Sequence, residues 1–358
     1  MHCINGRFND MCILPPANFI QATVIRRAGE EPQAVTQNMR ITYEMPTNQF
    51  VQNHTNFWQF VNPLFGVNLQ PGIGLAGFGT SGTMAPMQGY FEASAVPAIP
   101  ISDNGTWNPY QSAILKLYDS TNQLKAQARI VVPVSDELNC QKCHSSGGVA
   151  AKGISMPTLE QNILTLHDLR NHTNLMNQRP VLCSKCHSDN ALNLPGVAGV
   201  ESLSLAMHRK HSTLTNQPAC YDCHPGANTQ CNRSALPKMG PSSPTQPNCQ
   251  NCHGTLVTMA KGLIGGRKPW LQEPACTKCH GTQVSTGTTL YRQARGHGGL
   301  LCITCHNSPH AWWPSKNAAD NELPISIQGN NHALGYNNCK VCHTDGRQGV
   351  MPPHGGDD

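Results

Sequence analysis

Cys220-Tyr221-Asp222-Cys223-His224 is one of seven Cys-X-X-Cys-His segments in this chain of 358 residues, and all seven follow residue 139. Two cysteines and an adjoining histidine at this spacing are typical of covalent haem attachment. The two thiols bind the vinyl groups of one porphyrin, and the histidine binds its iron. The motifs therefore predict seven haem c groups. The attachment cysteines would be Cys140, Cys143, Cys183, Cys186, Cys220, Cys223, Cys249, Cys252, Cys276, Cys279, Cys302, Cys305, Cys339 and Cys342, and the axial ligands His144, His187, His224, His253, His280, His306 and His343.

Zinc is the main alternative for paired cysteines, because two thiolates are half of a common structural zinc site. Here a histidine directly follows every cysteine pair, and haem attachment accounts for all the motif cysteines without any four-ligand zinc site. We therefore expect haem and neither zinc nor a disulfide framework at the motifs.

The composition indicates a chain with few long helices and a thin apolar core. Charged residues are 13% of the chain and aromatic residues 6%, and there are 32 glycines and 27 prolines. The first cysteines of the motifs stand at 140, 183, 220, 249, 276, 302 and 339, which leaves little protein between haems. We expect a mostly irregular multihaem cytochrome c fold with few short helices over residues 136–358, in which the porphyrins stack closely.

The formal charge of +5 describes the chain without haem. Each porphyrin adds two propionates, so seven of them reverse the sign of the net charge. Lysine and arginine are also scattered, with no basic run. These observations exclude a nucleic-acid partner.

The remaining histidines supply candidates for the second axial ligand of each iron. Seven of the ten histidines outside the motifs lie in the haem region: His167, His172, His208, His211, His297, His310 and His332. Seven irons and seven candidates predict two histidines on every iron, which gives low-spin, low-potential haems without an open position. Met176, Met207 or Met239 is the alternative ligand for a single iron of higher potential.

Two helices are expected to carry four of these candidates. The capping-box pattern at Thr158–Gln161 begins a helix that would carry His167 and His172, which point in different directions and serve different haems. His208 and His211 are three residues apart on a second helix, where they would bind two neighbouring irons.

Residues 1–135 differ in character and read as short strands. Met39, Ile41, Tyr43 and Met45 alternate with polar residues, as in a half-buried strand. Residues 114–118 and 124–134 flank a turn at Asp119–Asn122 and predict a hairpin, with Leu124, Ala126, Ala128, Ile130 and Val132 on one face. We expect an N-terminal β-sandwich-like domain of immunoglobulin character. A short helix within residues 53–66 would interrupt it, burying Phe57, Phe60, Val61 and Leu64. The glycine-rich stretch 72–79 lacks the strand-then-helix context of a nucleotide site and is expected to be a loop.

The chemistry of attachment places the protein outside the cytoplasm, since bacterial cysteines are joined to haem after export. No apolar run is long enough to span a bilayer, and the chain opens on neither a basic nor an apolar leader, so we expect numbering from the mature chain. Cys3, Cys12 and Cys231 lie outside the motifs. We expect one disulfide and one free thiol among them, either Cys3 with Cys231 or Cys3 with Cys12.

The chain resembles the exported multihaem cytochromes of metal-reducing bacteria such as Geobacter. The segments that carry the likeness are residues 131–140, Ala219–Gly226 and Gly296–Leu300, and it is best over residues 130–345. The resemblance implies electron transfer at the outer cell surface or outside the cell, with the periplasm as the alternative. Partners would be other redox cytochromes or extracellular electron acceptors. Some cytochromes of this wider class form filaments with haems stacked through many subunits.

Two functions compete on these observations. The first is an electron conduit without a substrate of its own, and not an enzyme. The second is a multihaem reductase acting on a small oxyanion at one open iron. Such reductases often mark the active haem with a variant motif, and all seven motifs here are complete, which favours the conduit.

A homopolymer is the assembly that we weigh against a discrete carrier. A surface rich in Asn, Gln, Ser and Thr packs against itself more easily than a charged one. In such a polymer a terminal segment would cross into a neighbouring subunit, and His2 is favoured over His354 as the histidine that reaches a foreign haem.

Overall fold

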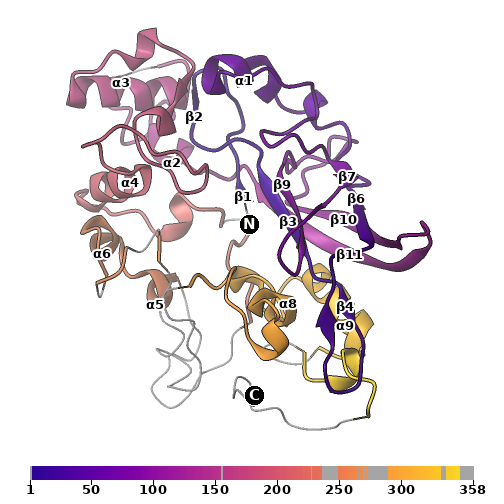
Figure 1. The fold of residues 1–358 in the computed structure, drawn as a ribbon. Helices are drawn as coiled ribbons and strands as arrows, with labels where there is room; N and C mark the ends of the chain where they lie inside the picture. The colour runs from indigo at the N-terminus through magenta and orange to yellow at the C-terminus, as the bar shows by residue number, and fades with distance from the viewer. Residues whose placement is uncertain are drawn as a thin grey trace.

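The computed structural model describes residues 2–154, 156–226, 228–235, 249–264, 266–268, 271–272, 289–331 and 336–346. Figure 1 shows the two parts of the fold. The strands lie mainly on the right of this view. The short helices that follow residue 140 descend on the left, from α3 at the top to α5, and continue below the strands through α8 to α9. The Cys-X-X-Cys-His motifs in the described part of the chain therefore follow a curved path beside the sheets.

The first 135 residues contribute eleven strands, one α-helix and one turn of 3-10 helix within the described residues. These are β1 (His2–Cys3), β2 (Met11–Cys12), β3 (Asn18–Ala22), β4 (Ile25–Arg26), β5 (Gln33–Ala34), β6 (Met39–Glu44), η1 (Val51–Asn53), α1 (Phe57–Phe65), β7 (Ser81–Thr83), β8 (Ala85–Pro86), β9 (Phe91–Val96), β10 (Tyr110–Asp119) and β11 (Leu124–Ser135). One sheet has the order β1-β11-β10-β6-β7 and another the order β3-β9-β8. β4 and β5 form a separate hairpin.

The predicted strand and hairpin are both confirmed. Ile41 and Tyr43 on β6 are buried while their neighbours are less so, as the alternation predicts. β10 and β11 pair antiparallel around the turn. The side chain of Asp119 accepts hydrogen bonds from the backbone N–H groups of Thr121 and Gln123, which holds the turn closed.

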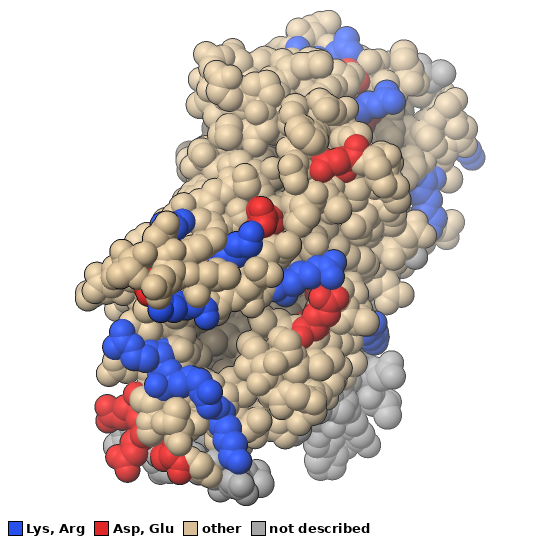
Figure 2. Space-filling view, turned by 90° about the vertical axis from the view of Figure 1, so that its right-hand side faces the viewer, with Lys and Arg blue, Asp and Glu red and all other residues tan. Residues whose placement is uncertain are grey.

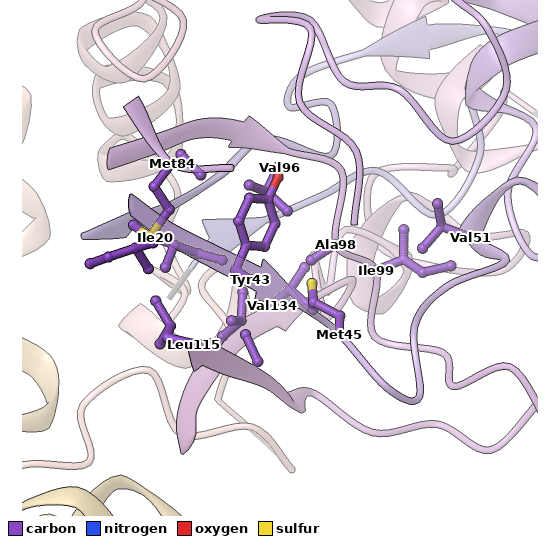
Figure 3. Close-up of a cluster of buried hydrophobic side chains, with 14 of the residues drawn as sticks. Ile20, Tyr43, Met45, Val51, Met84, Val96, Ala98, Ile99, Leu115 and Val134 are labelled. Atoms are coloured by element: carbon purple, nitrogen blue, oxygen red, sulfur yellow. The ribbon is translucent and has the colours of Figure 1, made fainter. Parts of the chain in front are cut away.

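The two sheets share one hydrophobic core (Figure 3). Ile20 comes from the smaller sheet, whereas Tyr43, Leu115 and Val134 come from the larger one. The Tyr43 hydroxyl donates to the carbonyl of Gly79 at 2.8 Å, so its polar group is satisfied inside the core. Apolar side chains from two sheets thus cover each other, as in packed sheet pairs. The immunoglobulin-like topology stays a prediction.

The face of β11 predicted from the alternation is buried only over the second half of the strand. Leu124 is 54% exposed and Ala126 is exposed, whereas Val132 and Val134 are buried. The alternation is present along the whole strand, but only its second half lies over the other sheet. A period of two identifies a common face and does not by itself identify what covers that face.

The helix α1 lies within the predicted range and buries Phe57, Val61 and Leu64, with Phe60 partly buried. It ends at Gly66, whose φ of 72° is the left-handed conformation that glycine adopts easily. The glycine-rich stretch 72–79 contains turns and no helix or strand, so the loop prediction is confirmed.

The haem region is built from short helical turns. Its described elements are α2 (Gln141–His144), α3 (Leu159–Asn171), η2 (Leu175–Asn177), β12 (Val181–Leu182), η3 (Cys183–Lys185), α4 (Leu203–Ser212), η4 (Cys220–Asp222), α5 (Cys249–His253), α6 (Leu256–Ala260), η6 (His297–Gly299), α8 (Cys302–His306), η7 (Pro309–Ala311), η8 (Ala318–Asn321), α9 (Glu322–Gln328) and η9 (Cys339–Val341). The cap at the start of α3 is confirmed, because the Thr158 side chain accepts from the N–H of Gln161. None of the described helices is long and apolar enough to cross a membrane.

The N-terminal segment pairs within its own chain, and the expected crossing of His2 into a neighbouring subunit stays a prediction. β1 pairs in parallel with the end of β11, and β2 pairs in parallel with β12. The Nε2 of His2 donates to the carbonyl of Pro15 at 2.6 Å. Burial lowers the pKa of His2 to about 4, so its ring is neutral at pH 7. The predicted domain boundary falls at the end of β11 and stays a prediction.

Candidate haem sites

Each described motif forms a single helical turn that turns its two cysteines and its histidine to one side. The backbone N–H of the histidine bonds the carbonyl of the first cysteine, at 2.9 Å for His144, 3.0 Å for His187 and 2.8 Å for His343. Residues three and four apart on a helical turn lie on the same face. The two thiols and the imidazole can therefore approach one porphyrin together, which is the geometry that haem attachment needs.

Five motif histidines face a histidine from outside the motifs. We number each pair by its motif: pair 1 is His144 with His211, pair 2 is His187 with His167, pair 3 is His224 with His208, pair 4 is His253 with His310, and pair 7 is His343 with His297. The ring centres are 6.5, 6.3, 6.3, 6.0 and 6.0 Å apart, in that order. Every pair joins one motif histidine to one distal candidate.

This separation fits one metal ion between the two rings. An imidazole nitrogen binds a metal at about 2.0 Å, so two rings on opposite sides of one ion have centres about 6 Å apart. Direct stacking would bring ring centres closer, and aromatic contacts range over about 4.5–7 Å without a fixed value. Five spacings within a range of 0.5 Å match the metal-bridged arrangement.

Hydrogen bonds at Nδ1 leave the other ring nitrogen, Nε2, available to bind a metal. Backbone carbonyls accept from Nδ1 in four ligands: Glu201 for His187 (2.7 Å), Ser204 for His208 (2.6 Å), Met207 for His211 (2.7 Å) and Gly29 for His343 (2.7 Å). Side-chain oxygens of Asn162 and Thr173 serve His144 (2.8 Å) and His167 (2.9 Å). Metal-binding histidines are typically oriented in this way. The Cys-X-X-Cys-His motif does not predict any of these six hydrogen-bond acceptors.

Burial makes several of the paired rings harder to protonate. Burial lowers the pKa of His144, His187 and His208, and the charge of His211 contributes at His144 and His208. Burial likewise lowers the pKa of His310 to about 4. A neutral imidazole has a free lone pair for a metal.

Several buried polar atoms beside the pairs lack a hydrogen-bond partner among the described residues. They include the Nη1 of Arg233, the Nε1 of Trp312 and the Oγ1 of Thr165. The backbone N–H of Arg233 bonds the carbonyl of His310 at 2.7 Å, and Trp312 lies two residues after that histidine. Porphyrin propionates are acceptors that would satisfy such donors. The donor groups and the ring pairs together fit haem c.

Pairs 1 and 2 are linked through the helix α3. His167 of pair 2 lies on this helix, and so does Asn162, which accepts from His144 of pair 1. The two residues are five positions apart, which is about 7.5 Å along a helix axis. Pairs 1 and 2 are therefore neighbours.

Pairs 1 and 3 are linked through α4, which carries both of their distal histidines, His211 and His208. Their motifs also touch, since Lys142 forms an ion pair with Asp222. Burial raises the pKa of the Cys140 thiol to about 11, and the nearby Cys223 adds to the rise. Helix α4 thus stands between two neighbouring sites, as its two histidines predict.

Pair 4 follows pair 3. Burial lowers the pKa of His224 in pair 3, and the charges of His208 and His253 contribute. The first cysteines of the two motifs also interact, because Cys249 raises the pKa of Cys220 in addition to burial. Helices α4 and α6 pack against each other beside these pairs.

The sixth motif lies between pairs 4 and 7. His310 of pair 4 follows the sixth motif by four residues, and His297 of pair 7 precedes it by five. Burial raises the pKa of Cys305 in the sixth motif to about 12, and Cys342 of the seventh contributes. Among the described sites the spatial order is therefore second, first, third, fourth, sixth and seventh, from α3 at the top of Figure 1 to the elements below the strands.

The remaining predicted ligands are placed differently. His172 ends α3 in the left-handed conformation (φ 53°), is exposed, and contacts no motif histidine among the described residues. His306 lies on α8. Cys276, Cys279, His280 and His332 lie outside the described residues. Met207 is 38% exposed and serves pair 1 through its backbone carbonyl, which accepts from His211.

Comparison with known proteins gives one family. The profile of cytochrome c7 and related cytochrome c matches residues 168–254, a stretch that contains the second, third and fourth motifs and α4. Neither the curated proteins nor the solved structures include a significant match to the chain. The family match implies c-type haem as the cofactor and an electron carrier rather than an enzyme. This stretch is thus similar to multihaem c-type cytochromes that transfer electrons.

Proposed function

We propose that this protein conducts electrons along a row of seven covalently bound haem c groups. The observation that carries the proposal is the set of five histidine pairs, each of which joins a motif histidine to a distal one at 6.0–6.5 Å. When bound, each haem c takes up and releases one electron at its iron.

The chain's own residues would fix where those electrons go. The motif cysteines hold each porphyrin by two bonds, so the cofactors cannot exchange. A histidine on each side of the iron leaves no position for a substrate. The hydrogen bonds at Nδ1 hold the rings in one orientation, which keeps the change in geometry on electron transfer small.

The row has two ends on opposite sides of the molecule. Among the sites that the structure describes, pair 2, beside α3, forms one end, and pair 7, beside the β4–β5 hairpin, forms the other. Electrons entering at one end would leave at the other. We propose that the partners are other redox cytochromes or extracellular acceptors, and that the protein works outside the cell or at its outer surface, with the periplasm as the alternative.

Haem content and turnover test this function. Protein made with a haem-attachment system is expected to carry seven covalent haems by mass and by pyridine haemochrome absorbance. At least the five paired irons should show the near-infrared magnetic circular dichroism of two histidine ligands. Multiple turnover of nitrite, hydroxylamine or a sulfur oxyanion by the reduced protein would instead support the reductase.

We also propose that copies join head to tail into a homopolymer. Charged side chains cover only a small part of the face in Figure 2, so charge repulsion there is weak. The exposed His172 lies at the end of the row formed by pair 2. In the polymer it would provide an imidazole to an iron of the next copy.

The His172→Ala variant tests the assembly. Wild-type protein is expected to form open polymers, and the variant mainly monomers, because the variant lacks the imidazole at the joint. Light scattering and negative-stain microscopy measure the difference. His54→Ala is the control, since the Nε2 of His54 bonds the carbonyl of Asp103 within the β-rich part. If the wild-type protein stays monomeric at micromolar concentration, the polymer proposal fails and the protein is a discrete electron carrier.

A further inference from the structure

The distal histidine of pair 4 differs from those of pairs 1, 2 and 3 in the atom that its Nδ1 contacts. The Nδ1 of His310 lies 3.4 Å from the sulfur of Cys231. In pairs 1, 2 and 3 the distal Nδ1 donates to an oxygen at 2.6–2.9 Å. If Nε2 of His310 binds the iron, Nδ1 carries the proton and the sulfur accepts its hydrogen bond. Sulfur is a weaker acceptor than oxygen.

Cys231 lies next to a second cysteine. Cys3 on β1 pairs with Ser135 of β11, and the Ser135 hydroxyl lies 3.3 Å from that of Thr229, two residues before Cys231. Burial raises the pKa of the Cys3 thiol to about 12, and the charge of Cys231 contributes. Both thiols are free in the structure. Cys12, the alternative partner, is instead buried next to Cys183.

We propose that Cys231 is a positioning residue for the haem of pair 4, and that a reversible disulfide between Cys3 and Cys231 sets the potential of that haem. The inference rests on the proposed electron-transfer function. With free thiols, the sulfur accepts the Nδ1 proton, makes His310 a stronger donor to iron, and favours the ferric state. In the disulfide, the sulfur of Cys231 is drawn toward β1, and its hydrogen bond with Nδ1 of His310 weakens. The reduction potential of the haem of pair 4 therefore rises.

The redox step balances within the protein. Two thiols lose two protons to water and two electrons, and one S–S bond forms. The oxidants are two ferric haems, those of pair 4 and of its neighbour pair 3, each of which gains one electron. Because pair 4 lies between pair 3 and the sixth motif, a change in its potential alters flow through the whole row.

Alkylation tests the disulfide. Holoprotein is prepared fully ferric or after treatment with excess dithiol, denatured in iodoacetamide, and mapped by mass spectrometry. Cys3 and Cys231 are expected as a linked pair in the first preparation and as alkylated thiols in the second, with Cys12 alkylated in both. Alkylated Cys3 and Cys231 in the ferric preparation would overturn the disulfide.

Potentiometric titration followed by optical absorbance tests the tuning. In wild-type protein, one of seven components is expected to move to higher potential when the pair is oxidised. In Cys3→Ser this component should stay at the low potential under both conditions, and in Cys231→Ala at the high one. Cys231→Ser should restore the low potential because its hydroxyl accepts the Nδ1 proton.

The haem count and the magnetic circular dichroism of the same samples distinguish a failure of this proposal from a failure of the proposed electron-transfer function. Seven haems with two histidine ligands but identical titrations in all variants would overturn the tuning alone. Missing haems or missing histidine pairs would overturn the electron-transfer function itself.

Discussion

Replacing His211 with alanine is expected to convert one low-spin iron of this protein into a high-spin iron and to interrupt electron flow along the row. His211 is the distal histidine of pair 1, which lies between pairs 2 and 3. No other described histidine faces His144, so its iron loses the sixth ligand. The covalent haem count should stay at seven, because the cysteines of the first motif are unchanged.

Electron paramagnetic resonance and stopped-flow reduction measure the two effects of His211→Ala. The low-spin signal should fall by about one seventh, and added imidazole should restore it by filling the vacated position. His54→Ala is the matched control, since it removes a histidine of the β-rich part and no pair member. An unchanged low-spin signal in His211→Ala would mean that another residue binds this iron.

The motif ligands can be read from the sequence, but the distal pairing cannot. Attachment needs residues at fixed short spacing, and a single helical turn then sets their directions. The pairing of His167 with His187, or of His310 with His253, depends on how segments up to 57 residues apart fold together. The two histidines of α4 are the exception, since their spacing on one helix predicts two neighbouring sites.

His172 shows why counting histidines is insufficient. It stands five residues after His167, which suits a ligand on a continuing helix. The helix ends at Asn171 instead, and the left-handed conformation of His172 turns the chain away. The spatial order of the sites is also hidden in the sequence, because the second motif occupies one end of the row that the described sites form. It is fixed there by the pairing of β12 with β2, a strand 170 residues earlier in the chain.

In the β-rich part too, the sequence predicts local features but not the contacts between distant segments. Alternation predicts β6 and the β10–β11 hairpin because both are local patterns. The parallel pairing of β1 with the end of β11 joins residues 132 positions apart and leaves no local trace. Leu124 follows the pattern of a buried face and is nevertheless exposed, since no second sheet lies over the hairpin tip.

Asp320→Asn is expected to lower the free energy of unfolding by about 3–5 kcal/mol, the usual cost of leaving one member of a buried ion pair without its partner. Asp320 accepts from Nε and Nη2 of Arg233 at 2.7 and 3.1 Å. Both side chains are only 3% exposed. Asparagine keeps one acceptor but not the negative charge, so the guanidinium would remain buried and uncompensated.

The loss should reach beyond the ion pair itself. The Arg233 guanidinium also lies 5.4 Å from the ring centre of Tyr110 on β10, and its backbone N–H holds the carbonyl of His310. This residue therefore ties the larger sheet to pair 4. We expect the variant to show a weakened low-spin signal from one iron below its unfolding midpoint, before the other irons change.

Guanidinium unfolding of the holoprotein, followed by far-ultraviolet circular dichroism and by haem absorbance, measures both effects of Asp320→Asn. Glu44→Gln is the control, because it removes the same charge from a half-exposed pair with Lys116 at 2.8 Å, where the cost is about 0–1 kcal/mol. Equal losses in the two variants would show that the buried pair adds no more stability than a surface one.

A buried ion pair must first recover the hydration that both ions lose on folding. Replacing both members by apolar residues of similar volume would therefore be far less costly than removing one member. The double variant Arg233→Met with Asp320→Leu should therefore recover part of the stability that Asp320→Asn loses.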